Sequence, residues 1–219
     1  MTTLLIATRN AHKVGEIRAI LGARFQFLTL NDFPAAPKVI EDAPTFSGNA
    51  AKKAVELAKW LAAEHRTSNI EHPTSNFVLA DDSGLEVDAV NGAPGVHSAR
   101  FAAMDSAKSG NTPDADNNAK LLRLLNSVPP EKRTARFHCV IALVEIAPRS
   151  ALRAPHLFDG VCEGRIIFEP RGKNGFGYDP LFVPVGFEQT FAELGEEVKN
   201  KISHRSKALQ KLKRFFTAG

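Results

Sequence analysis

The 219-residue sequence has little of what marks a specialised structural class. Its two cysteines, Cys139 and Cys162, cannot form a disulfide framework, and neither belongs to a C-x-x-C pair, so a reducing, cytoplasmic setting is expected. The longest apolar run has six residues, from Cys139 to Val144, far fewer than the roughly 20 of a membrane helix. No basic segment followed by a long apolar core marks a secretory signal. We therefore expect neither a membrane protein nor a secreted, disulfide-rich one.

Several catalytic and binding motifs are also missing. The sequence has no G-x-x-x-x-G-K-[ST] phosphate loop, no cysteine–histidine cluster with metal spacing and no recognisable Ser–His–Asp grouping. His138 and Cys139 are neighbours on an expected strand, where packing is a better explanation than a nucleophilic pair. These absences exclude phosphate-loop enzymes and zinc modules and leave other nucleotide and metal sites open.

The composition is that of an ordinary globular domain. Hydrophobic residues make up 43% and charged residues 24% of the chain, close to globular averages. A chain of this length buries about 70% of its unfolded surface. No repeat or low-complexity linker divides the sequence, so we expect one domain over residues 1–219.

The positive net charge of +4 comes from the C-terminal end. No acidic residue follows Glu197, whereas seven basic ones lie between Lys199 and Arg214. Without these seven, the chain has 21 basic and 24 acidic side chains, a net charge of −3. A nucleic-acid coat needs cations over a broad face, so stable nucleic-acid binding is not expected. A solvated C-terminal helix is the plain alternative.

Hydrophobic spacing predicts strands and helices that alternate along the whole chain. Expected strands are 4–7, 25–30, 77–80, 136–146 and 161–168. Expected helices are 11–21, 46–65, 114–125 and 203–216, and expected loops are 66–76, 148–156 and 171–180. Asp81 to Gly84 is predicted to be a turn, followed by a half-buried strand in which Leu85, Val87 and Ala89 alternate with acids. The class is therefore α/β with one main sheet.

The junction of the first strand and first helix is a candidate anion site. Thr8 to Lys13 combines hydroxyl, amide and ammonium donors with the free N–H groups of a helix N-terminus. The alternative is an ordinary polar first turn, with Asn10 as a cap and Lys13 in solvent.

Three acids form a candidate metal group. Asp81 and Asp82 directly follow an apolar strand, and carboxylates at strand ends commonly bind Mg²⁺. Adjacent strand residues point to opposite faces, so at most one of the two naturally enters a given cleft. A turn in which Asp and Ser bond the local backbone explains the pattern equally well. Glu41, in a loop near prolines, carries little signal alone.

The long expected helix has a lysine on its apolar side. At about 100° per residue, Phe46, Ala50, Leu57 and Leu61 share one stripe, and Lys53 lies near it. An inward lysine either extends along the apolar surface to water or reaches a buried anion. Asn49 lies on the same flank.

Two further groups lie toward the C-terminus. Arg171 to Pro180 carries three glycines around Phe176, Tyr178 and Asp179, a pattern that suits a flat ligand or simply a packed loop. If Ser203 caps the last helix, His204 and Arg205 occupy its first turn, where the helix dipole disfavours cations. An anion or an electron-rich ligand edge would compensate, and a solvated turn is the alternative.

The order of these blocks is distinctive. They are T-x-N-x-x-K at 8–13, E-x-x-x-T-F-x-x-N-x-x-x-K at 41–53, A-D-D-S-G-L at 80–85, G-A-P-G-V-H-S-A-R at 92–100, G-F-G-Y-D-P-L-F at 175–182 and K-x-x-x-S-H-R at 199–205. Over nearly its whole length the sequence resembles the inosine triphosphate pyrophosphatase family of dITP/XTP pyrophosphatases. The departures are three connecting segments that look long, at 65–76, 105–113 and 148–156.

The resemblance implies a fold, a reaction and residue roles. The fold is an elongated mixed sheet flanked by helices, in two lobes with a nucleotide in the cleft between them, usually as a homodimer. The reaction is Mg²⁺-dependent hydrolysis of ITP, dITP or XTP to the monophosphate and pyrophosphate. Glu41 and Asp82 would bind Mg²⁺, and Asp82 and Lys53 would act in catalysis. Substrate binding falls to Thr8, Arg9, Asn10, Ala11, His12, Lys13, Asn49, Ser83, Arg100, Phe176, Gly177, Tyr178, Asp179, Lys199, His204 and Arg205.

Two other functions stay open at this point. A phosphohydrolase for pyrimidine or methylated nucleotides would share the phosphate and metal groups and differ in the base pocket. An RNA-binding module without hydrolysis is suggested by the basic end and opposed by the net negative charge of the rest.

Overall fold

The computed structural model describes residues 2–67, 76–105, 110–146 and 153–217. Its strands are β1 (Thr2–Ile6), β2 (Phe25–Thr29), β3 (Phe77–Val87), β4 (Thr134–Glu145), β5 (His156–Ile166) and β6 (Phe182–Pro184). Its helices are α1 (Ala11–Leu21), α2 (Phe46–Thr67), α3 (Asp114–Leu124), α4 (Phe191–Ile202) and α5 (His204–Phe215). A short 3₁₀ segment, η2, covers Gly95–Arg100.

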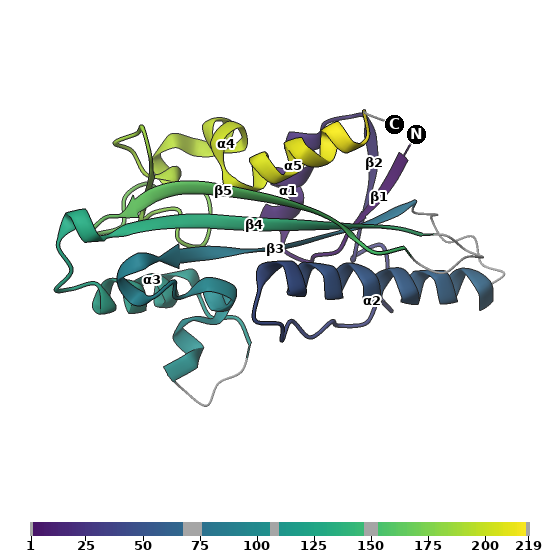
Figure 1. Cartoon of the computed structure of the whole chain (residues 1–219), viewed down its shortest axis with the longest axis horizontal. Coiled ribbons are helices and arrows are strands. Elements are labelled where there is room, and N and C mark those ends of the chain that lie inside the picture. Colours follow the sequence, from purple (N-terminus) through teal and green to yellow (C-terminus); the bar gives the residue numbers. More distant parts are fainter. Residues whose placement is uncertain (1, 68–75, 106–109, 147–152, 218–219) are drawn as a thin grey trace. The chain divides into compact units, whose positions relative to one another are not determined.

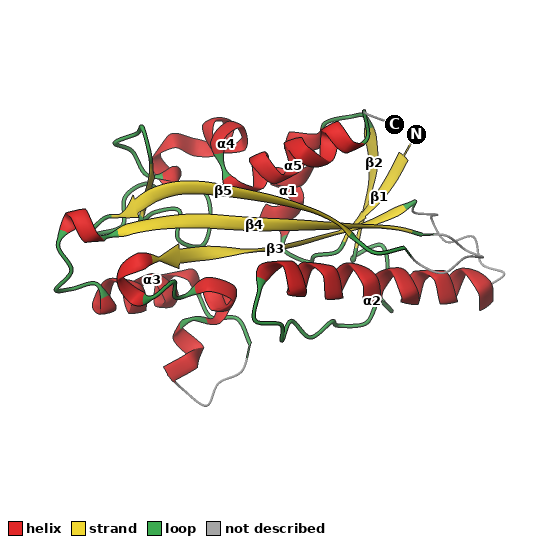
Figure 2. Ribbon diagram, viewed as in Figure 1, coloured by secondary structure: helices red, strands yellow, loops and turns green. Residues whose placement is uncertain are grey.

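The strands form one mixed sheet in the order β2-β1-β3-β4-β5-β6. β1 pairs in parallel with both β2 and β3, whereas β5 and β6 are antiparallel. The three long strands β3, β4 and β5 lie side by side, and helices flank them (Figures 1 and 2). This confirms the predicted α/β class with a mixed sheet.

The chain divides into two compact units, each built from separate stretches of sequence. Unit 1 comprises 1–82, 140–159 and 208–219, and unit 2 comprises 83–139 and 160–207. All three long strands pass from one unit to the other, β3 at the bond between Asp82 and Ser83. The expected sites therefore fall into two sets, which are described separately below.

The core of unit 1 is formed by apolar faces that the sequence spacing predicts. Leu4, Leu5 and Ile6 of β1 are at most 1% exposed, as expected of a strand with a neighbour on each side. The α2 residues Phe46, Ala50, Leu57 and Leu61 are all buried, so the predicted stripe is confirmed.

Unit 2 has its own core, in which β3, β4 and β5 contribute alternate residues. Leu85 and Val87 of β3 and Phe137 of β4 pack in one cluster with Phe182 and Phe191. The intervening side chains Glu86, Arg136 and His138 are half-buried and polar. This alternation is what a sheet with one packed face produces.

The predicted turn at Asp81 to Gly84 is wrong. β3 continues without a break from Phe77 to Val87, so both aspartates lie in mid-strand. Asp-Asp-Ser-Gly is turn-forming by local propensity, but the position of β3 next to the long strand β4 overrides it, since the register with β1 ends at Leu79. The half-buried strand expected beyond the turn is the second half of the same strand.

The helix ends show why these segments are helical. Asn10 caps α1 by accepting from the Lys13 amide, and Thr190 and Glu193 form a reciprocal capping box at α4. Ser203 accepts from the Ser206 amide at 3.1 Å, which confirms it as the cap of the last helix. The sequence did not predict α4, which is interrupted at Gly195, or the three-residue β6. Most of the expected loops at 66–76 and 148–156 lies outside the described residues.

Two glycine-to-alanine substitutions are expected to change the free energy of unfolding in opposite directions. A Cβ at Gly164 of β5 would lie 2.4 Å from the Val183 carbonyl oxygen and 2.5 Å from the Phe182 ring, so Gly164→Ala should lower the free energy of unfolding by about 1–3 kcal/mol. Gly15 in α1 has nothing within 4 Å, so Gly15→Ala should raise it by about 0.5–1 kcal/mol. Urea denaturation measures both. Equal effects would contradict the tight approach of β5 and β6.

Candidate functional site

The first set of site residues surrounds the N-terminus of α1 in unit 1. The Asn10 side chain accepts from the Lys13 amide at 3.1 Å, and the Asn10 amide donates to the Thr8 hydroxyl at 3.1 Å. Arg9, Asn10, Ala11 and His12 are exposed, and Thr8 and Lys13 are half-buried. The prediction that Asn10 caps the helix is confirmed. This segment therefore offers donors to an anion in solvent reach.

Lys13 does not extend into solvent, as the ordinary-turn alternative required. Its ammonium group pairs with the carboxylate of Asp81, which is 1% exposed in its side chain. Asp81 thus acts as the counter-ion of an α1 lysine, a role that the sequence did not indicate. The pair fixes Lys13 against β3.

Lys53 reaches the same part of β3 from α2. Its Nζ lies 2.7 Å from Glu41 Oε1 and donates to the Asp81 carbonyl oxygen at 3.1 Å. The side chain is buried, which confirms the prediction that Lys53 lies on the inner side of the helix. Lys52 next to it pairs instead with the exposed Asp42. The inward lysine therefore meets a half-buried carboxylate and a buried carbonyl, which is closer to the second of the two possibilities given by its spacing.

Asp82 is a buried carboxylate among these charges. It is 6% exposed, and burial raises its pKa from 3.8 to about 6. Lys13 and Lys53 lower the pKa and Glu41 raises it, so all three charges lie close enough to act on Asp82. The structure therefore brings Glu41, Asp82 and both lysines together.

Asp82 also has an unused acceptor. Within the part of the chain that is described, its Oδ2 has no hydrogen-bond partner, and neither does Nδ2 of Asn49. Asn49 lies near enough to lower the pKa of Asp82, while its own Oδ1 accepts from the Ala43 amide at 2.8 Å. A buried carboxylate oxygen without a donor is costly unless a ligand or a cation meets it.

These oxygens suit Mg²⁺. The ion is commonly held by one or two carboxylates together with water and substrate phosphates, and Glu41 and Asp82 supply two. No group of three or more His, Cys, Asp or Glu side chains that could hold a metal by themselves is found among the described residues. The donor set thus fits an ion shared with a ligand better than a closed, all-protein metal site.

The second set of site residues lies in unit 2, around the loop at 175–179. Asp179, 1% exposed, binds Lys199 through Oδ2 at 2.5 Å, and the same oxygen accepts from the Phe176 amide at 2.9 Å. A Cβ at Gly175 would lie 2.2 Å from this oxygen, so the position requires glycine. The loop is thereby closed around a buried ion pair, with Lys199 Nζ 4.4 Å from the Phe176 ring centre.

The first turn of α5 contributes two buried cationic or polar side chains. Arg205 donates to the Ser83 hydroxyl at 2.8 Å, and its guanidinium carbon lies 5.9 Å from the Phe176 ring centre. His204 stacks on Phe137 with a ring separation of 4.8 Å. Both side chains are buried, so the solvated-turn alternative for this segment is wrong.

Tyr178 ties the loop to η2. Its hydroxyl donates to the Ser98 carbonyl at 3.0 Å. Burial raises the pKa of Tyr178, and the nearby Asp114 carboxylate raises it further. Sequence reasoning did not indicate Ser98 or Asp114, because a carbonyl acceptor has no sequence signal and an acid in a first helical turn is common. Arg100, at the end of η2, is half-exposed.

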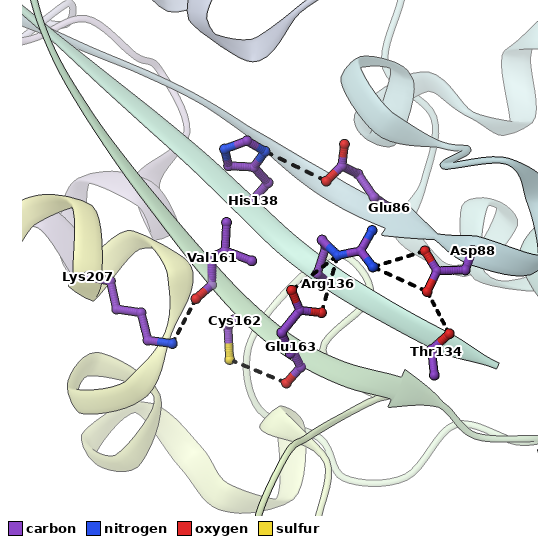
Figure 3. A network of polar contacts seen from close by, with 9 residues as sticks. All are labelled: Glu86, Asp88, Thr134, Arg136, His138, Val161, Cys162, Glu163 and Lys207. Carbon is purple, nitrogen blue, oxygen red and sulfur yellow. Dashed lines mark hydrogen bonds and ion pairs between the residues drawn. The ribbon is translucent and has the colours of Figure 1, made fainter. Parts of the chain in front are cut away.

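His138 and the cysteines take no part in either set. His138 Nδ1 lies 3.6 Å from Glu86, and Arg136 bridges Asp88 and Glu163 on the same polar face of the sheet (Figure 3). Both cysteines are buried, and burial raises the pKa of Cys162 to about 11, which keeps it protonated near neutral pH.

Among the described residues no helix is long and apolar enough to span a membrane.

Comparisons with known proteins agree over almost the whole chain. The sequence profile of the Ham1 family matches residues 4–215. The dITP/XTP pyrophosphatase of Desulforamulus reducens is 47% identical over 95% of this chain and 92% of that protein, and that of Geobacter sulfurreducens is 48% identical over 97% and 96%. The solved structure of a HAM1 protein from Coxiella burnetii has a TM-score of 0.80 at 38% identity and covers 100% of both chains.

The buried charge of Asp82 predicts a stability that depends on pH. Its pKa in the folded protein, about 6, exceeds the ordinary value of 3.8, so the folded state binds the Asp82 proton more tightly than the unfolded state does. Protonation of Asp82 therefore stabilises the fold at low pH, and this stabilisation is lost as the pH rises from 4 through 6. Without divalent cations, Asp82→Asn should raise the free energy of unfolding by about 1–3 kcal/mol at pH 7.5 and by nothing at pH 4. Urea unfolding with a chelator measures this. Asp42→Asn, at an exposed acid, should not raise the free energy of unfolding. A loss of stability in Asp82→Asn at pH 7.5 would contradict the raised pKa of Asp82.

Proposed function

The chain belongs to the Ham1 family, and we propose that it hydrolyses the non-standard purine nucleoside triphosphates ITP, dITP and XTP to the monophosphate and pyrophosphate. The proposal depends on the sequence identity of 47–48%, over nearly the whole chain, to two proteins named dITP/XTP pyrophosphatase. The charges gathered around Asp82 support the phosphate chemistry, and the loop at 175–179 supports base recognition.

The phosphate end would bind to the set in unit 1. The exposed donors of residues 8–12 and the N-terminus of α1 would hold the polyphosphate, and Lys13 and Lys53 would neutralise the leaving pyrophosphate. Asp82 would orient and deprotonate the attacking water. Its pKa of about 6 lies near the working pH, where a general base is most effective.

Mg²⁺ is the cofactor that these residues fit. Glu41 and Asp82 would hold it, with Asp82 using the acceptor that lacks a partner among the described residues. When bound, the ion neutralises charge on the phosphates and the leaving group. Asp81 would support the group indirectly, because its carboxylate already pairs with Lys13.

The base would bind to the set in unit 2. The Phe176 ring offers a stacking surface with Lys199 and Arg205 beside it, and His204, which stacks on Phe137, would complete the proposed base pocket. Hypoxanthine and xanthine carry a 6-oxo acceptor where adenine carries a 6-amino donor. Arg205 has only donors, so it would pair with the oxo group and be left unsatisfied by adenine. Ser83, adjacent in the chain to Asp82, holds the guanidinium.

The wider setting follows from the same proposal. We propose one functional domain over residues 1–219, acting in the cytoplasm as a homodimer and without stable nucleic-acid binding. The engaged basic side chains near the C-terminus support the last point. Lys199 pairs with Asp179, Lys211 with Asp159, and Lys207 donates to the Val161 carbonyl. Because these basic side chains already have partners within the protein, they form less of a continuous positive surface for the phosphates of a nucleic acid.

Pyrophosphate release tests the function directly. With Mg²⁺, ITP and XTP should be hydrolysed at kcat/KM values at least about 100-fold above those for ATP, GTP and dUTP, and a chelator should abolish release. Asp82→Asn should lower kcat at least about 1,000-fold, because positioning of water and of the ion are both lost.

The stability measurement on the same variant serves as its control, since a folded but inactive Asp82→Asn isolates the chemistry. A near-normal rate in that variant would refute the role of Asp82. A preference for dUTP or a methylated nucleotide would instead favour the alternative phosphohydrolase.

Base selectivity tests Arg205. Arg205→Ala should lower the ratio of kcat/KM for ITP over ATP at least about tenfold, because the donors to the 6-oxo group are lost. Lys207→Ala removes a cation from the same helix that donates to the Val161 carbonyl, and it should leave the ratio unchanged. An unchanged ratio in Arg205→Ala would rule out this role.

A further inference from the structure

The N-terminal half of α3 holds the 175–179 loop by both main-chain polar groups of Gly177. The Gly177 amide donates to Asp114 Oδ2 at 2.6 Å, and Asn118 Nδ2 donates to the Gly177 carbonyl at 3.1 Å. A residue whose amide and carbonyl are both bonded by side chains of one helix has little freedom to rotate. These contacts were not predicted from the sequence.

The two α3 residues form a matched pair. Asp114 and Asn118 are four residues apart, so they lie one above the other on the same face of the helix. Asn118 is buried, and Asp114 is exposed. The Asn118 Oδ1 atom has no partner in the described part of the chain, so this amide binds the loop through its donor alone.

α3 is itself firmly anchored in unit 2. Lys120 donates to the Phe101 carbonyl at 2.7 Å, and Leu121 is fully buried. At the other end, the buried Arg133 donates to the carbonyl of Leu125 at 2.6 Å and thereby caps the helix. Nearer the start of the helix, Asn117 accepts from the Ala102 amide at 2.9 Å, so the part of α3 that carries Asp114 and Asn118 is also held in unit 2.

The loop needs such a support because of its glycines. Gly175 and Gly177 have φ values of 77° and 64°, and glycine reaches many other conformations at little cost. Phe176 stands between them. Asp179 fixes the amide of Phe176 from one side, and α3 fixes the next residue from the other.

From this geometry we propose that Asp114 and Asn118 are positioning residues of the base site, which hold Gly177 so that the Phe176 ring stays beside Lys199 and Arg205. This rests on the proposed function, since it assigns the base to that loop. Neither residue touches the phosphate group or the reacting atoms in this proposal. Their loss should therefore weaken binding and base selectivity and leave the chemical step unchanged.

Four variants separate this role from general effects. Asn118→Asp keeps the shape but turns the donor into an acceptor facing the Gly177 carbonyl, and Asp114→Ala removes the acceptor of the Gly177 amide. Asp114→Asn keeps an acceptor oxygen and should restore most of the wild-type behaviour. Asp116→Ala is the matched control, because it removes an exposed acid from the same helical turn without a contact to the loop.

The measurements are steady-state hydrolysis of ITP and ATP and hydrogen exchange of the Gly177 amide by NMR. Asn118→Asp and Asp114→Ala should raise KM for ITP about tenfold and lower the ITP/ATP ratio about tenfold, with kcat within about twofold. In Asp114→Ala the Gly177 amide should exchange at least about tenfold faster, and in Asp116→Ala it should exchange as in the wild type.

The outcomes are distinct. A fall in kcat at constant KM, an unchanged ITP/ATP ratio, or equal effects of Asp114→Ala and Asp116→Ala would overturn the positioning role. If the wild-type protein releases no pyrophosphate from any purine triphosphate, the proposed function fails instead. In that case Gly177 exchange decides alone: faster exchange in Asp114→Ala with recovery in Asp114→Asn supports the positioning, and unchanged exchange refutes it.

Discussion

Charge balance in the interior of unit 1 is the constraint on which the candidate site depends. Lys13 meets Asp81, and Lys53 meets Glu41, so each buried ammonium has a carboxylate. Asp82 is the acid left over; burial raises its pKa, and its Oδ2 atom has no hydrogen-bond partner among the described residues. A fold tolerates such a group at a cost in stability. In our proposal a divalent cation beside Asp82 supplies the missing positive charge.

Helices α1, α2, α3 and α5 and most strands were predictable because their signals are local. α1 begins and ends where its spacing and cap indicate, and α2 buries the predicted stripe. The failure at Asp81 to Gly84 has a physical reason: the turn propensity of four residues is weaker than the hydrogen bonds of a central strand. α4 is interrupted at Gly195 and β6 has only three residues, so neither presents an unbroken pattern of ordinary length.

The structure brings Glu41, Asp82, Lys13 and Lys53 together, all four singled out in the sequence, but the sequence did not show which of them pair. The inward side of Lys53 and the cap at Asn10 follow from periodicity and composition, and the family resemblance supplied the roles of Glu41 and Asp82. Which groups pair is set by tertiary structure. Asp114 lies 63 residues from the Gly177 that it binds, and Lys13 lies 68 residues from Asp81. Contacts at such separations leave no pattern in a single sequence.

The route of the chain between the two units limits how the protein can be divided. The chain crosses from one unit to the other four times, at 82–83, 139–140, 159–160 and 207–208, and each crossing falls inside a strand or a helix. No contiguous gene fragment therefore encodes either unit. A chimaera that exchanged one unit with a relative would need a junction in the middle of β3, β4, β5 and α5, so the phosphate and base sites that we propose could not be exchanged separately by simple fusion of fragments.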